Sequence, residues 1–168
     1  MMKKVTTLFF GLAFLVLAAC QQQKTENTIA EPIDLVGLEQ GIREVFELST
    51  ELFQNKDVGG LVDRFVADGV LKIPGRPPIV GHEALRANYE GTVALENFEL
   101  TIEPYLIRIS KSGDMAFALA EFAVSFNTPD GPFHEYGISQ ITFVLVDGRW
   151  KMAAENLSPI TKPAEGEG

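Results

Sequence analysis

Residues that usually carry catalytic or metal chemistry are scarce in this chain of 168 residues. It has one cysteine, Cys20, and two histidines, His82 and His134. One thiol excludes an internal disulfide and a thiolate metal site, and two distant histidines do not form a metal site by themselves. The sequence also has no phosphate-binding glycine loop, no nucleophile elbow and no metalloprotease motif. We therefore expect no metal and no cofactor.

Positive charge is also in short supply. The chain has 14 lysines and arginines against 23 aspartates and glutamates, which gives a formal net charge of −9. Binding to nucleic acid requires a basic surface, so this balance argues against a nucleic-acid partner. It argues equally against adhesion to anionic lipid head groups.

The start of the chain does contain one apolar run. Residues 5–17 follow Lys3 and Lys4 and lead into Leu-Ala-Ala-Cys at 17–20. The run is short for a stable membrane span, which needs about 20 residues, so it predicts a bacterial lipoprotein signal peptide over residues 1–19. Cys20 would then carry a diacylglycerol and an amide-linked fatty acid such as palmitate, and two or three acyl chains anchor stably. The alternative is a plain cleaved signal peptide, with Cys20 present by chance.

The predicted anchor places the protein in the cell envelope. Gln21 follows the cysteine where an aspartate would favour the inner membrane, so we expect the outer membrane, facing the periplasm, if the source is Gram-negative. Residues 20–31 are polar and read as a lipidated flexible tether, and residues 161–168 read as a disordered tail. Residues 32–160 are long enough for one domain with its own core.

Within this domain, helical spacing gives way to strand spacing. Apolar spacing predicts a helix over 32–55, a shorter helix capped by Asp57, and a third over 81–94. Asp68-Gly69 is expected to form a turn before a short strand at 70–73. Period-two patterns then predict strands at 98–110, 115–128, 133–146 and 149–158, with Asp147-Gly148 as a hairpin turn. This order indicates an α+β domain with helices on one face of an antiparallel sheet.

Four segments occur in the order and spacing typical of one known superfamily. They are NKDV with LVDRFVADGV (55–58 and 61–70), PGRPPIVGHEAL (74–85), SGDMA (112–116) and DGRWKM (147–152). Through them, residues 33–158 resemble the nuclear-transport-factor-two-like superfamily, in particular its SnoaL-like branch. The resemblance implies a curved antiparallel sheet that forms a cone around a long N-terminal helix, with a pocket at the wide end. It also implies a homodimer through the outer face of the sheet.

The acid and base residues of related enzymes are not found at the matching positions. Ketosteroid isomerases of this superfamily use an aspartate base, a tyrosine and a second acid, and local matching places these at Ile73, Ser49 and Gln140. None of the three is the required residue, so isomerisation by that route is doubtful. Dehydratases of this fold use a His–Asp pair, for which only His82 and His134 are available.

Alternation along two strands suggests other residues that could work in a pocket. Glu121 stands in a largely apolar run, and burial would raise its pKa and suit it to act as a base. His134 and Tyr136 lie on a strand face that mixes polar and apolar groups, as cavities do. These three are the candidate catalytic residues. The alternative for Glu121 is a position at the rim or dimer face, paired with Arg108 or Arg149.

Three further residues are candidate ligand contacts. Gln140 shares the mixed face of His134 and Tyr136, and Trp150 and Asn156 share one face of the last strand by simple alternation. From these observations we expect a lipoprotein that binds a small apolar ligand, or a protein partner, without catalysis. The alternative is a cofactor-independent isomerase, dehydratase or cyclase that acts on a small hydrophobic substrate.

Overall fold

The computed structural model describes residues 33–160. The predicted signal peptide, the lipidated Cys20, the tether over 20–31 and the tail over 161–168 lie outside the described residues. No helix in the described part is long and apolar enough to cross a membrane.

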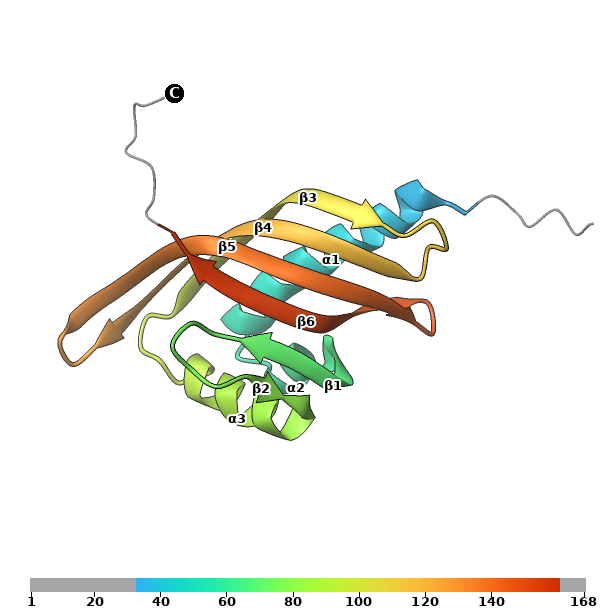
Figure 1. The fold of residues 1–168 in the computed structure, drawn as a ribbon. Coiled ribbons are helices and arrows are strands. Elements are labelled where there is room, and N and C mark those ends of the chain that lie inside the picture. Colours follow the sequence, from blue (N-terminus) through green and yellow to red (C-terminus); the bar gives the residue numbers. More distant parts are fainter. Residues whose placement is uncertain (1–32, 161–168) are drawn as a thin grey trace, which may run out of the picture. The chain divides into compact units, whose positions relative to one another are not determined.

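The described residues form three helices and six strands in an α+β arrangement (Figure 1). The elements are α1 (Leu35–Gln54), α2 (Val58–Asp63), β1 (Phe65–Lys72), β2 (Ile79–Val80), α3 (Gly81–Val93), β3 (Glu99–Ile109), β4 (Met115–Thr128), β5 (Gly131–Val146) and β6 (Arg149–Pro159). The predicted helices and the four long strands are confirmed to within about three residues at each end. The two-residue strand β2 was not predicted.

The strands form one curved sheet in the order β2-β1-β6-β5-β4-β3. All neighbours are antiparallel except β1 and β6, which run parallel. The predicted turn at Asp68-Gly69 is wrong, because both residues lie inside β1. The pairing of β1 with β6 shifts register between Phe65 and Val70, and this irregular stretch explains why a turn-like pair occurs within a strand.

Helix α1 packs across the inner face of the sheet (Figure 1). Its buried side chains are Ile42, Phe46, Ser49 and Leu52, which lie on one stripe. Opposite them, β4 presents three buried alanines, Ala116, Ala118 and Ala120. Small side chains leave room for the helix over the middle of the sheet, α1 comes closest to β3, and larger neighbours such as Phe143 fill the space beside it.

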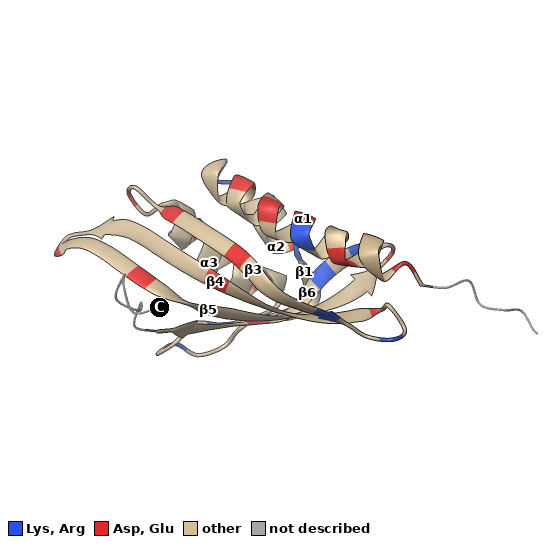
Figure 2. Cartoon of the chain, turned by 90° about the horizontal axis from the view of Figure 1, so that it is seen from above, with Lys and Arg blue, Asp and Glu red and all other residues tan. Residues whose placement is uncertain are grey.

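Negative charge lies along the side of α1 that faces away from the sheet (Figure 2). Glu44, Glu47 and Glu51 are exposed there, and Glu39 accepts a hydrogen bond from Arg43 at 2.7 Å. The separation of charged and apolar residues around the helix follows from burial of only one of its faces.

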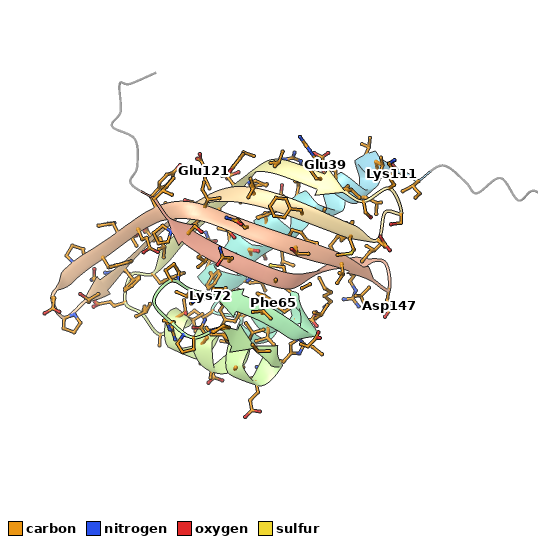
Figure 3. The ribbon with its side chains drawn as sticks, in the orientation of Figure 1. Glu39, Phe65, Lys72, Lys111, Glu121 and Asp147 are labelled. Atoms are coloured by element: carbon orange, nitrogen blue, oxygen red, sulfur yellow. The ribbon has the colours of Figure 1, made fainter. Side chains whose placement is uncertain are left out.

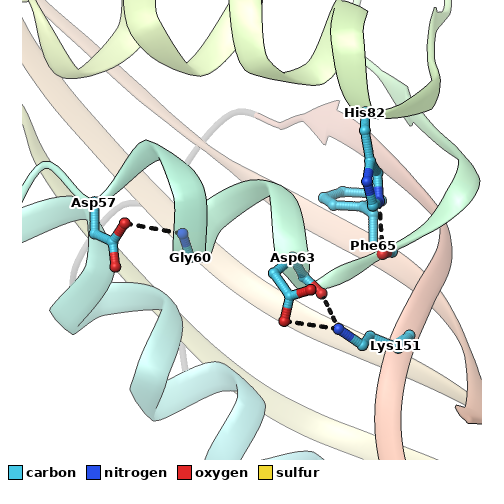
Figure 4. Close-up of polar contacts among 6 residues, drawn as sticks. All are labelled: Asp57, Gly60, Asp63, Phe65, His82 and Lys151. Carbon is cyan, nitrogen blue, oxygen red and sulfur yellow. Dashed lines mark hydrogen bonds and ion pairs between the residues drawn. The ribbon is translucent and has the colours of Figure 1, made fainter.

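Two aspartates and a histidine fix the segment between α1 and the sheet (Figure 4). Asp57 caps α2 by accepting from the backbone N–H of Gly60 at 2.9 Å, as predicted. Asp63 pairs with Lys151 of β6 at 2.8 Å, and this contact lowers the pKa of Asp63. His82, at the start of α3, donates from Nε2 to the carbonyl of Phe65 at 3.0 Å.

Candidate ligand pocket

A pocket of about 390 Å³ opens where the inner face of the sheet extends past the alanines under α1. The inner face of β4 changes there from alanine to Phe122, Val124 and Phe126, all of which line the pocket. Helices α1 and α3 and the segment after β1 provide the remaining walls. The lining is mostly apolar, with a few polar groups, as is typical of sites for small molecules.

One side of the pocket is a row of four phenylalanine rings. Phe53 of α1 lies 5.2 Å from Phe98, Phe98 lies 6.5 Å from Phe126, and Phe126 stacks on Phe133 at 4.7 Å. Each of these rings lines the pocket, and Phe133 remains 37% exposed. Rings in offset contact present flat surfaces, so this row suits a flat apolar molecule.

A half-buried arginine lies in the same pocket. Arg64 follows the last turn of α2, and its guanidinium carbon is 5.9 Å from the ring centre of Phe53 and 6.0 Å from that of Tyr89. Its Nη1 donates to Ser49, and its Nη2 lies 3.4 Å from the Tyr89 hydroxyl. Its Nε is buried and has no hydrogen-bond partner. A buried donor without a partner is costly, so it marks a place where another group can bind.

A carboxylate also reaches the pocket. Glu155 of β6 is only 9% exposed and accepts a 2.7 Å hydrogen bond from Ser139 of β5, which is fully buried. Its inward position depends on a bulge. Thr142 pairs with Ala154 but Phe143 pairs with Met152, so Ala153 is an extra residue in β6. The extra residue reverses the alternation after Met152 and turns Glu155 toward the inside of the sheet.

Tyr89 of α3 completes the polar end of the pocket. Its ring is almost fully buried, and burial is the main cause that raises the pKa of its hydroxyl well above the usual value. The negative charge of Glu155 raises this pKa further, whereas the Arg64 charge lowers it. Tyr89 therefore stays protonated across the physiological range and can donate a hydrogen bond.

The structure does not place the predicted catalytic residues in this pocket. Glu121 is exposed on the outer face of β4, with Glu103 opposite it on β3 (Figure 3). Tyr136 lies on the same outer face, where its hydrogen bond to Glu121 raises its pKa. His134 is exposed beside them, in an open hollow on that face. Glu121 thus has the exposed outer-face position of the alternative interpretation, but neither ion pair in residues 33–160 joins it to Arg108 or Arg149.

The predicted ligand contacts are also located elsewhere. Gln140 is exposed on the outer face, and Asn156 lies opposite it on that face because of the bulge in β6. Trp150 is buried, but it packs against α1 and donates from Nε1 to the carbonyl of Leu38 at 2.9 Å. It lines a separate groove of about 320 Å³ between α1, α2 and the start of β6.

The candidate residues on β4 and β5 lie on the outer face for one physical reason. Residues that pair across an antiparallel ladder point to the same side, and Glu121 pairs with Ile138, so Tyr136 and Gln140 share its face. The mixed composition of that face is typical of a sheet surface half open to solvent. The inner face of β5 carries Glu135, Ser139 and Ile141 instead, and Glu135 reaches the pocket rim.

Two of the positions matched to ketosteroid isomerases do lie in the pocket. Ser49 and Ile73 both line it, whereas Gln140 does not. Among the polar groups of this pocket, Arg64, Tyr89 and Glu155 stand at positions that the match did not include. His82 bonds to the backbone and His134 lies on the outer face, so the two histidines are not partners in one site. Within residues 33–160, no group of three His, Cys, Asp or Glu side chains could hold a metal ion.

A comparison with protein families decides the classification. The family model described as "SnoaL-like domain" matches residues 38–155. This chain belongs to the SnoaL-like domain family. No curated protein matches it.

Solved structures support the same fold for this SnoaL-like domain. A Mycobacterium tuberculosis protein of unknown function, Rv3472, is 22% identical, with a TM-score of 0.67 over 77% of this chain and 76% of that one. A protein from Novosphingobium aromaticivorans described as NTF2-like with a cystatin-like fold is 18% identical, with a TM-score of 0.65 over 77% and 86%. A ketosteroid isomerase-like protein from Erwinia carotovora atroseptica is 22% identical, with a TM-score of 0.62 over 76% and 96%. These likenesses show the fold alone.

The buried hydroxyl of Tyr89 predicts alkaline sensitivity of this SnoaL-like domain. A pKa raised above the ordinary 10.0 means that the folded state holds the proton more tightly than the unfolded state. This stability is fully present below about pH 10 and is lost as pH rises toward the folded pKa. When pH rises from about 8 to about 11, the free energy of unfolding measured in urea should fall for both proteins, and it should fall by about 1 kcal/mol less for Tyr89→Phe than for the wild type.

The matched control is Tyr105→Phe, because Tyr105 is 56% exposed. It should lose stability with pH as the wild type does. Equal pH dependence of the wild type and Tyr89→Phe would contradict the burial argument.

Proposed function

We propose that this domain binds a small, largely apolar molecule in the internal pocket, and that binding without catalysis is its primary activity. The observation that carries the proposal is the lining of the pocket, with stacked phenylalanines along one side and a few polar groups at its inner end. A dry engineered cavity of about 150 Å³ accepts benzene. The volume of about 390 Å³ therefore suits a molecule with about two fused rings.

A homodimer through the outer face of the sheet is part of the proposal. Tyr105, Met115 and Phe117 are 56%, 47% and 38% exposed on β3 and β4, and Ile138 and Val144 of β5 are half-buried beside β4. Exposed apolar side chains grouped on one sheet face are typical of contact surfaces. A two-fold axis would bring this face against its own copy and bury it.

The prediction for occupancy can be tested on the chain from Thr25 onward by native mass spectrometry. We expect a dimer that carries the extra mass of one small molecule in each subunit. Leu100 lines the pocket, so Leu100→Trp should fill it and abolish the extra mass.

Glu47→Trp provides the control, because Glu47 is exposed on the outer side of α1. It should keep the ligand. Retention of the same mass by Leu100→Trp would place the ligand outside this pocket and contradict the proposal. A clean dimer with no added mass would favour a domain that acts through its dimer and partner contacts.

We further propose that the domain is tethered to a membrane of the cell envelope through acylated Cys20. The signal-peptide layout at residues 1–20 supports this. Expressed in a bacterium that processes lipoproteins, the chain should lose residues 1–19 and gain the mass of a diacylglycerol and a fatty acid. Cys20→Ser should prevent the lipid from being added. A mature wild-type chain without lipid would show that the segment is a plain signal peptide.

A second candidate function is acid–base catalysis in the same pocket, and Glu155 is the observation that favours it. An isomerase, dehydratase or cyclase needs a proton acceptor beside its substrate, and Glu155 lies in the pocket with Tyr89 as a nearby donor. Glutamine at 155 can still accept from Ser139 but cannot take up a proton. If the domain is an enzyme, Glu155→Gln should retain the pocket ligand and lose turnover by at least about 100-fold. Turnover that survives this change would exclude Glu155 as the base.

A further inference from the structure

Within residues 33–160, Arg64 is a charged group without a charged partner. The two ion pairs within residues 33–160 join Arg43 to Glu39 and Lys151 to Asp63, and neither includes Arg64. Its hydrogen-bond partners, Ser49 and Tyr89, are neutral hydroxyls. Lys151 is a useful contrast, because it is similarly shielded from solvent and does have a carboxylate at 2.8 Å.

Aromatic contacts only partly replace the missing counter-ion. The guanidinium lies near the rings of both Phe53 and Tyr89, which attract a cation through their faces. They cannot accept a hydrogen bond from the buried Nε, which has no partner in the structure. An anionic oxygen that binds against the guanidinium in the pocket would supply the missing negative charge. Tyr89, which remains protonated, offers a second donor to the same oxygen.

Glu155 limits how much negative charge the pocket can take. It lines the same pocket as Arg64, but the two are not within ion-pair distance of each other. A ligand with one carboxylate can place it against Arg64 and extend its apolar body along the phenylalanine row. A second carboxylate in the pocket would meet the acidic side chains of Glu155 or of Glu135 at the rim.

We propose that the pocket binds a planar aromatic monocarboxylate, whose carboxylate accepts hydrogen bonds from Arg64 and Tyr89 and whose rings stack along the Phe53–Phe98–Phe126–Phe133 row. This inference rests on the proposed function and narrows its ligand class. Arg64 is then a ligand-binding residue rather than a residue that stabilises the fold.

The test uses three ring-matched compounds on the full chain, purified in a non-ionic detergent, with calorimetric titration and a detergent-only blank. The compounds are 2-naphthoate, the neutral 2-naphthol and naphthalene-2,6-dicarboxylate. We expect 2-naphthoate to bind at least about tenfold more tightly than either of the others. In Glu155→Gln, the affinity for the dicarboxylate should come closer to the affinity for 2-naphthoate.

The matched variants are Arg64→Leu and Arg43→Leu, which change the net charge equally. Arg64→Leu should lower the affinity for 2-naphthoate by at least about tenfold and leave the affinity for 2-naphthol unchanged. Arg43→Leu, on the exposed side of α1, should change neither affinity. Arg64→Leu without ligand should be at least as stable as the wild type, because an unpaired charge is removed and Ser49 still donates to Val45.

The outcomes separate the two proposals. If 2-naphthol binds as tightly as 2-naphthoate, or Arg64→Leu has no effect on 2-naphthoate, the carboxylate proposal is overturned while the pocket remains a binding site. If none of the three compounds binds, the ligand proposal and the pocket function both fail. If Arg64→Leu does not fold, the order of the three compounds on the wild type still decides the question.

Discussion

The packing of α1 against the inner face of the sheet determines the rest of the molecule. Helix α1 comes closest to β3, and the small, buried Ala116, Ala118 and Ala120 of β4 leave room for its apolar stripe over the sheet. Past the alanines the inner face of β4 continues with Phe122, Val124 and Phe126, and α1 ends at Gln54. Phe53 of α1 and Tyr89 of α3 form walls around these side chains, and the space between them is the pocket.

Two of the charged groups in this apolar space come from places where the chain departs from regular structure. Arg64 occupies the short connection between α2 and β1, and Glu155 turns inward because Ala153 is an extra residue in β6. A regular β6 would present Asn156 to the pocket in place of a carboxylate. One irregular residue thus decides whether the Glu155 carboxylate faces the pocket, and an arginine with an unsatisfied Nε suggests that stability has been exchanged for binding.

The sequence was informative about elements and misleading about faces. Long alternating runs and turn residues such as Asp147-Gly148 located the four long strands well, because each signal is local. Which face is inside depends on cross-strand register, and the mixed face of β5 is outside. The sequence of β6 does contain a sign of the bulge. In a regular strand the apolar Trp150 and Met152 would lie on one face and the apolar Leu157 on the other. Nothing local marks Arg64, because its role comes from Phe53 and Tyr89, which are distant in sequence.

The position of β6 in the sheet has a consequence for how the chain folds. This last strand lies between β1 and β5, so β1 has only the two-residue β2 as a partner until residues 149–159 are available. Helices α2 and α3, which pack beside β1, depend on the same late event. Contacts between such distant segments form slowly, because a long loop must close before they are gained. The core around β1 therefore stays incomplete until residues 149–159 have been synthesised and have joined the sheet.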